Sequence, residues 1–457
     1  MRPAALRGPT LTPRGRVDVR ARVDGTVQVA LGEFGGRQVV VASTASDRRR
    51  GALAGRDGDS LATAARTALQ LRLPLVLQLA SSGADVSDGI DALHGWGEAA
   101  AAVSACSGIV PVIAVATGPV ISGPALLLGL ADLVVMGPAA VAFVSGPAMV
   151  AAFTGVNVGL EALGGVAVHA AASGLCAVES DDPDDAVAEL LEYLPDHADH
   201  EPAMVPTTDP ADRPVPELRD VVPARDNASY DIRDVLGAVA DDGVTCELWG
   251  RWAPQLVTAL ARLDGRPVGV VANQPRALAG TLDIAASQKA ARFVRFCDAF
   301  NLPIVTLVDT PGFLPGKDLE WRGMIRHGAE LAFAYAEATV PRVCVILRKA
   351  FGGAYIVMDS KGLGNDVCLA WPGAEIAVMG AQGAVQILHR RADPADRAGL
   401  EDDYRERFLT PWPAAERGFV DGVIDPADTR AVLTSTLAQL ATKRELLHGR
   451  KHDGGPL

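Results

Sequence analysis

Short runs of apolar, β-branched residues alternate along the chain with longer amphipathic stretches. The apolar runs, bounded by Gly or Pro, predict strands, which in the first half are Gln38–Ala42, Leu75–Leu79, Val112–Val115 and Leu133–Met136. Amphipathic stretches at Asp88–Ser104 and Asp283–Phe300 predict helices, the second with Asp283 as its N-cap. A third helix is predicted over Ala186–Leu194. Alternation of strands and helices, with continuously apolar strands, predicts an α/β fold built on largely parallel, covered sheets.

An internal repeat is the most informative feature of the chain. Four short segments of the first half recur in the second half, 229 residues later for the first two pairs and 230 residues later for the last two. The pairs are Gly36–Val40 with Gly265–Gly269, Leu73–Val76 with Leu302–Val305, Val110–Ile113 with Val340–Val343, and Ser122–Ala125 with Gly352–Tyr355. The chain is therefore predicted to contain two copies of one domain, each of about 200 residues.

The boundary between the copies is predicted from a change in composition. The stretch Pro195–Arg233 is rich in Pro, Asp and His. We expect a first copy over residues 1–200, a Pro/Asp-rich linker over residues 201–229 and a second copy over residues 230–457.

Charge and cysteine usage exclude several classes of protein. The net charge is −13, from 42 basic and 55 acidic residues, which argues against a nucleic-acid partner. Gly and Pro interrupt the longest apolar stretches, so no membrane span is expected. The six cysteines are scattered and none forms a C-x-x-C pair, which predicts reduced core residues, no disulfide and no metal site. Together these features favour a cytoplasmic enzyme or enzyme subunit.

The chain contains no motif for a side-chain nucleophile, a zinc protease, a phosphate-binding loop or a dinucleotide. An apolar strand, a Gly-rich turn and a helix start with small residues occur instead in both copies, over Val115–Leu126 and Ile346–Tyr355. Consecutive backbone N–H groups at such a turn can stabilise an oxyanion. One such turn alone could serve only tight packing, but its repetition favours catalysis. The predicted catalytic residues are Ser122, Gly123, Gly353 and Ala354.

Ordered blocks of the second half carry a family resemblance. They are Val271–Pro275, Leu282–Ile284, Lys289–Phe293, Asp309–Gly316, Arg348–Tyr355, Ala370–Pro372 and Val378–Ala381. At these residues the chain resembles the carboxyltransferase (β) subunits of biotin-dependent acyl-CoA carboxylases, of the propionyl-CoA carboxylase type. The resemblance is close from Tyr230 to about Arg391.

The resemblance implies two tandem crotonase-like domains, assembled as a homohexamer that is a trimer of dimers. Its active site would lie between the first copy of one subunit and the second copy of another. Gly353 and Ala354 would hold the ureido carbonyl of biotin, and the first-copy turn would hold the thioester carbonyl of the substrate. The implied biotin-side residues are Phe351, Gly352 and Tyr355, and the implied substrate-side residues are Gly83, Ala84 and Ile356. Ile356 stands where propionyl-type enzymes have Asp, which predicts a different acyl pocket.

The first copy departs from the family pattern. Ala80–Asp85 stands where the family has Asp-Ser-Gly-Gly-Ala-Arg, so the acid and the Arg are both lost. The turn reads Ser122-Gly123-Pro124 instead of Gly-Gly-Ala, and proline has no backbone N–H. If the oxyanion hole uses Gly123 and the next residue, one donor is missing. If it uses Ser122 and Gly123, both donors survive but a hydroxymethyl group crowds the site.

The predicted partners follow from what this chain does not carry. It has no Met-Lys-Met biotin attachment site and no ATP-grasp region, so biotin would come in trans on a carrier protein, with a biotin carboxylase as partner. The substrate would be an acyl-CoA or a carrier-protein thioester. Two other functions stay open: a decarboxylase of a malonyl- or methylmalonyl-type thioester or related β-carboxy acid, and a non-catalytic ring partner of an active paralogue. The biotin-side blocks argue against a crotonase-type hydratase.

Overall fold

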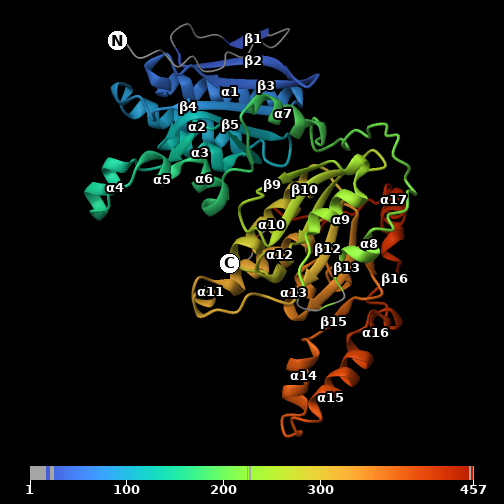
Figure 1. The fold of residues 1–457 in the computed structure, drawn as a ribbon. Coiled ribbons are helices and arrows are strands. Elements are labelled where there is room, and N and C mark those ends of the chain that lie inside the picture. The colour runs from blue at the N-terminus through green and yellow to red at the C-terminus, as the bar shows by residue number, and fades with distance from the viewer. Residues whose placement is uncertain (1–16, 21–24, 224, 226–227, 452–453, 456–457) are drawn as a thin grey trace. The chain divides into compact units, whose positions relative to one another are not determined.

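The computed structural model describes residues 17–20, 25–223, 225, 228–451 and 454–455. The chain divides into two compact units, Met1–Pro202 and Ala203–Leu457 (Figure 1). Within the described residues, each unit is built on an eight-stranded sheet. No helix in these described ranges is long and apolar enough to cross a membrane.

The first unit has the strand order β1-β2-β3-β4-β5-β6-β8, with β7 paired to β5. The pairs β1–β2 and β2–β3 are antiparallel and the other pairs are parallel. The strands are β1 Val17–Arg20, β2 Val27–Phe34, β3 Arg37–Thr44, β4 Leu75–Ser81, β5 Val112–Ile121, β6 Leu133–Met136, β7 Val141–Phe143 and β8 Val178–Glu179. The α-helices are α1 Gly55–Leu71, α2 Ile90–Ser104, α3 Gly123–Leu130, α4 Pro147–Thr154, α5 Leu160–Gly164, α6 Val166–Val168 and α7 Pro183–Glu192.

The second unit has the strand order β16-β14-β13-β12-β11-β10-β9, with β15 paired to β13. The strands are β9 Thr245–Leu248, β10 Leu256–Leu263, β11 Arg266–Asn273, β12 Ile304–Thr310, β13 Arg342–Phe351, β14 Val367–Ala370, β15 Glu375–Ala377 and β16 Gly422–Val423. The α-helices are α8 Leu218–Val221, α9 Ile232–Val239, α10 Ile284–Ala299, α11 Lys317–Trp321, α12 Met324–Glu337, α13 Gly352–Val357, α14 Ala381–Leu388, α15 Arg397–Tyr404, α16 Pro411–Glu416 and α17 Thr429–Leu440.

The two units repeat the same order of elements. The antiparallel pair β2–β3 corresponds to β10–β11, and the parallel strands β4 and β5 correspond to β12 and β13. Registers repeat as well: Val40 lies opposite Leu75, and Gly269 lies opposite Ile304, each 229 residues later. All seven residues of β12 are buried, as expected for a parallel strand covered on both faces.

The predicted strands and helices are confirmed, with small shifts at their ends. Asp283 accepts a hydrogen bond from the Ala286 N–H at 2.8 Å and caps α10, as predicted. The largest shift is at β5, which runs to Ile121, six residues beyond its predicted end, because its last three residues pair with β7. All six cysteines are buried thiols, none joined in a disulfide.

Helices α1 and α2 approach each other closely at glycines. A Cβ at Gly58 would lie 2.1 Å from the backbone of Gly95, so neither position has room for a side chain. This contact fixes the path of α2 and thereby the place of the next residue, Trp96.

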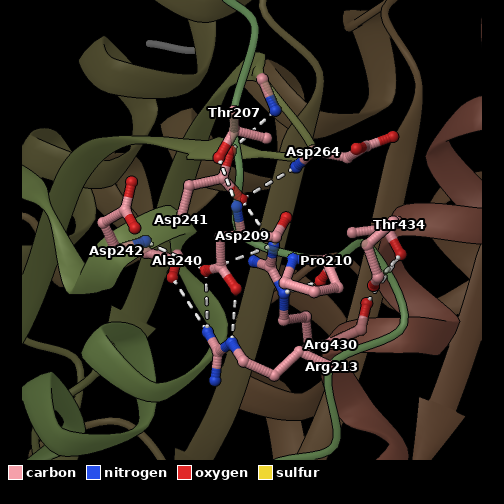
Figure 2. Close-up of polar contacts among 12 residues, drawn as sticks. Thr207, Asp209, Pro210, Arg213, Ala240, Asp241, Asp242, Asp264, Arg430 and Thr434 are labelled. Atoms are coloured by element: carbon pink, nitrogen blue, oxygen red, sulfur yellow. Dashed lines mark hydrogen bonds and ion pairs between the residues drawn. The ribbon is translucent and has the colours of Figure 1, made fainter.

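A buried ionic cluster joins the segment around Asp209 and Arg213 to the rest of the second unit (Figure 2). The Arg430 guanidinium, fully buried in α17, donates to the Asp241 carboxylate at 2.7 Å and to the Pro210 carbonyl at 3.0 Å. Arg213 donates to the Asp209 carboxylate at 2.6 Å. The compact second unit begins at Ala203, so most of the segment predicted as a linker, residues 201–229, is counted with it.

Candidate active site

The second-copy turn, made of Gly352, Gly353 and Ala354, joins β13 to α13. Gly352 has a φ of +60°, and a Cβ there would lie 3.2 Å from the Val378 carbonyl oxygen, so the position favours glycine. Gly353 is exposed and Ala354 is buried. The first N–H groups of a helix have no acceptor within it, so the N–H groups of Gly353 and Ala354 can donate to a ligand.

The loop after β12 borders this turn. The Phe313 ring lies against Gly353, where a Cβ would be 3.2 Å from its Cε2 atom. The Gly312 N–H donates to the Thr310 hydroxyl at 3.3 Å, and the Gly312 carbonyl accepts from the Leu282 N–H at 3.1 Å. The corresponding loop of the first copy is held in the same way, since Gly83 donates to the Ser81 hydroxyl at 3.2 Å and accepts from Leu53 at 2.9 Å.

A buried ion pair supports the second-copy loop. The Arg348 Nε donates to the Asp309 carboxylate at 3.0 Å, and the Lys349 N–H donates to the same carboxylate at 3.1 Å. Burial raises the pKa of Asp309, and Arg348 opposes that shift. The corresponding residues of the first copy, 229 or 230 positions earlier, are Ala80 and Gly118. Neither residue is charged, and the two lie close together, since a Cβ at Gly118 would be 3.5 Å from the Ala80 Cβ.

The first-copy turn, made of Ser122, Gly123 and Pro124, joins β5 to α3. Ser122 has φ 64° and ψ −132°, close to the φ of its counterpart Gly352. Its N–H donates to the Phe143 carbonyl at 2.9 Å and is therefore not available to a substrate. Gly123 is the first residue of α3, and its N–H has no acceptor within the helix. Of the two ways of forming a hole at this turn, the one with Ser122 and Gly123 as backbone donors lacks the Ser122 N–H.

Three other features of the site were not predicted from the sequence. The Trp96 ring lies against Gly123, 3.2 Å from where a Cβ would be. The ion pair between Arg348 and Asp309 is the second, although both residues belong to blocks that carry the family resemblance. Asp85, where the family has Arg, accepts hydrogen bonds from Ser87 and from Arg49 at 2.6 Å, and these partners, Ser87 first, lower its pKa. Sequence spacing does not reveal such contacts, because they join elements far apart in the chain.

The remaining predicted residues lie beside the two turns. Gly83 faces Ser122, since a Cβ at Gly83 would lie 3.7 Å from the Ser122 Cβ. Ala84 forms a bridge with Leu53 after this loop. Phe351 is buried at the end of β13, while Tyr355 and Ile356 follow on α13. Ile356 is exposed, and burial raises the pKa of Tyr355 to about 12.

A hollow of about 510 Å³ lies elsewhere in the first unit, at the carboxyl ends of β6 and β8. Its lining includes Met136, Glu161, Glu179 and Asp181, and it contains none of the predicted site residues. Across the described residues, no group of three or more His, Cys, Asp or Glu side chains has an arrangement that could hold a metal ion.

Two copies of one α/β domain, each built on a largely parallel sheet, define a tandem crotonase-like protein. The model of the carboxyl transferase domain family matches residues 9–454. The chain belongs to this family, which confirms the predicted family, fold class and enzyme class.

Individual relatives agree with this assignment. A propionyl-CoA carboxylase carboxyltransferase subunit from Haloferax mediterranei is 42% identical over 453 residues, covering 97% of this chain and 88% of the relative. The α subunit of a methylmalonyl-CoA decarboxylase from Veillonella parvula is 43% identical over 396 residues, covering 86% and 77%. A crystal structure of a transcarboxylase 12S hexamer with methylmalonyl-coenzyme A and methylmalonic acid bound matches with a TM-score of 0.93 and 42% identity, covering 95% of this chain and 85% of that one.

Proposed function

We propose that this chain is the carboxyltransferase subunit of a biotin-dependent acyl-CoA carboxylase, moving a carboxyl group between carboxybiotin and an acyl thioester. The observation that carries the proposal is the second-copy turn. It combines Gly352 at positive φ, an exposed Gly353 and a buried Ala354 at the start of α13. This arrangement supplies two backbone donors for a single carbonyl oxygen.

The residues around the second-copy turn fit biotin. A Cβ at Gly312 would meet nothing within 4 Å, so the space beside this glycine of the loop after β12 is open. Biotin presented by a carrier protein would supply the carboxyl group and a ureido nitrogen that accepts the α-proton. The N–H groups of Gly353 and Ala354 would hold its ureido carbonyl, with Phe313 and Tyr355 beside it. These donors orient the ring, and no side-chain base is required.

The first-copy turn would bind the acyl thioester. The Gly123 N–H would donate to the thioester carbonyl, and Gly83 and Ala84 would border the substrate. Ile356 would contribute to the acyl pocket in place of the family's Asp. Binding at this turn would leave the α-carbon free to exchange its carboxyl group.

We further propose that copies of this chain assemble as a hexamer and that a biotin carboxylase and a biotin carrier are its cytoplasmic partners. The matching helices α4 and α14 expose large apolar side chains in each unit, which are Met149, Phe153, Ile387 and Leu388. Phe153 is 90% exposed. Exposed apolar residues grouped on a surface are typical of an interface. The related transcarboxylase structure is described as a hexamer.

The test incubates the purified protein with malonyl-CoA and methylmalonyl-CoA, with and without free biotin. Mass spectrometry follows the loss of the carboxyl group from the thioester. Biotin-dependent loss is expected, since the second-copy turn should bind free biotin weakly. A Gly353→Pro variant removes one donor N–H and should abolish this loss while the circular dichroism spectrum is retained. Full activity of that variant would contradict the role of the turn.

A second candidate function is supported by the decarboxylase relative and by the altered first-copy turn. A decarboxylase of a malonyl- or methylmalonyl-type thioester would release carbon dioxide without added biotin. Loss that does not depend on biotin would therefore favour this function. No loss in either assay would favour another thioester carrier or a non-catalytic ring partner.

A further inference from the structure

We infer that the Ser122 hydroxyl takes the place of the missing Pro124 N–H as the second hydrogen-bond donor to the thioester oxygen. This inference rests on the proposed function, and it concerns the first-copy turn alone. The role is a direct one, since the hydroxyl would touch the reacting thioester.

The two equivalent turns carry different numbers of backbone donors. Gly353 and Ala354 each carry a backbone N–H at the second-copy turn. The residues 230 positions earlier are Gly123 and Pro124, and only Gly123 has an N–H. The Ser122 N–H does not fill the gap, because it donates to the Phe143 carbonyl at 2.9 Å. The backbone of the first-copy turn therefore offers one donor where its counterpart offers two.

The Ser122 side chain begins beside the loop that contains Gly83. Ser122 is exposed, and its Cβ lies 3.7 Å from where a Cβ of Gly83 would be. Gly83 and Ser122 belong to the two loops that border the proposed substrate. At the second copy the equivalent residues are Gly312 and Gly352, which leave that space without a side chain. The Ser122 Cβ, which carries the hydroxyl, therefore lies beside the loop that contains Gly83.

Ser122 adopts an unusual backbone conformation. Its φ of 64° and ψ of −132° fall in a region that glycine adopts readily and that other residues avoid. A serine held in this conformation keeps a side chain where the second copy has none. Sparsely populated backbone conformations of this kind cluster at active sites.

The chemistry of the step needs no further reactant. When the bond between the α-carbon and its carboxyl group breaks, the electron pair moves into the thioester carbonyl, whose oxygen becomes negatively charged. The carboxyl group would pass to a ureido nitrogen of the biotin that the assay supplies. The proton displaced from that nitrogen would pass to the α-carbon, and the electron pair would return from the oxygen to give the decarboxylated thioester. The Ser122 hydroxyl and the Gly123 N–H each donate a hydrogen bond to that oxygen, and Ser122 keeps its proton throughout. Donors placed where negative charge develops favour the transition state over the ground state.

The experiment restores the missing N–H in a background without the hydroxyl. Biotin-dependent loss of methylmalonyl-CoA is measured for the wild type, Ser122→Ala, Ser122→Gly, Pro124→Ala and the double variant Ser122→Gly/Pro124→Ala.

Ser122→Ala and Ser122→Gly should each lower kcat about 10²–10³-fold, the effect of losing one oxyanion donor. The double variant should regain most of the wild-type rate, because the Pro124→Ala change supplies a backbone N–H at that position. Ser104→Ala, an exposed serine at the end of α2, is the matched control and should match the wild type.

The rates of these variants distinguish a Ser122 that donates to the thioester from one that only supports the turn. A purely structural serine would not be replaced by a backbone N–H two residues away, so recovery in the double variant supports the inference. Ser122→Ala or Ser122→Gly at the wild-type rate would overturn it and leave the proposed function standing. An inactive wild type with an active double variant would also overturn it, since the serine would then block the site. No loss by the wild type or by any variant, with all melting temperatures alike, would refute the proposed function and the inference with it. An active wild type with a double variant no faster than Ser122→Gly would overturn the inference alone.

Discussion

The ring of Phe313 lies against Gly353, so close that a Cβ on the glycine would be 3.2 Å from the ring. Trp96 makes the same kind of contact with Gly123 at the other turn, also at 3.2 Å. The two rings come from different elements, since Phe313 follows β12 and Trp96 belongs to α2. The residue 229 positions before Phe313 is Ala84. Each turn is therefore covered by an aromatic ring, although the two copies supply it from different places.

Gly353→Ala should lower biotin-dependent turnover about tenfold or more, because either the ring or the turn must shift by a few tenths of an ångström. The kinetics of methylmalonyl-CoA loss as a function of biotin concentration measure this effect. Gly373→Ala is the control, since a Cβ at this exposed glycine meets nothing within 4 Å. Equal rates for both variants would show that the Phe313 contact does not matter for biotin.

Much of the fold was predictable, because the repeat is visible in short stretches of the sequence. Four segments at a nearly constant spacing predicted the duplication, and apolar runs with Gly or Pro at their ends predicted the parallel strands. The site was predictable as far as the two turns, since glycine and proline act on the backbone directly. The hydrogen bond from the Ser122 N–H to the Phe143 carbonyl was not predictable, because it depends on the pairing of β5 with β7, whose paired residues lie 22 positions apart in the chain. Trp96 was missed for a related reason: its place depends on the contact between Gly58 and Gly95.

Contacts of the Pro- and Asp-rich segment, residues 201–229, show the same limit. Its many Pro and Asp residues are typical of a solvated connection. The side chain of Asp209 is nevertheless only 6% exposed and lies 3.4 Å from that of the buried Arg430, a residue more than 200 positions later. A long-range partner of this kind leaves no trace in local composition.

Arg430→Met should destabilise the second unit by about 3–5 kcal/mol, because it leaves the Asp241 carboxylate buried without its cation. Urea unfolding measures the loss.

The Arg430→Met change also removes the hydrogen bond to the Pro210 carbonyl, so trypsin should cleave the chain faster after Arg213. Arg219→Met removes an exposed pair with Asp425 and should leave both measurements nearly unchanged. Unaltered cleavage in Arg430→Met would show that the cluster does not hold this segment.

The buried Lys289 should make the free energy of unfolding depend on pH. Its ammonium group is buried and donates to the carbonyls of Trp249, Trp252 and Leu256 at 2.6 to 2.9 Å. Burial lowers the pKa of Lys289 from 10.5 to about 7. Between these two values the unfolded chain keeps a proton that the folded chain releases, so the free energy of unfolding rises with pH. The slope from this group approaches about 1.4 kcal/mol per pH unit.

Denaturant unfolding of the wild type and Lys289→Met between pH 7 and 9.5 tests this dependence. The wild type should gain stability relative to the variant as the pH rises, whatever the offset between the two proteins. Lys317→Met, at an exposed lysine in α11, should run parallel to the wild type. Parallel curves for Lys289→Met and the wild type would contradict the lowered pKa.

Phe153→Asp should weaken the proposed assembly. Phe153 is 90% exposed at the end of α4, and an ionised carboxylate at a buried interface costs free energy unless it is paired. Light scattering coupled to size exclusion should show a hexamer for the wild type and smaller species for the variant. Leu446→Asp changes a residue of similar exposure, 94%, in the C-terminal tail and should leave the hexamer intact. A wild type that elutes as a monomer would contradict the proposed assembly, whereas a hexameric Phe153→Asp would place the interface on other residues and direct the next substitution to Leu388 of α14.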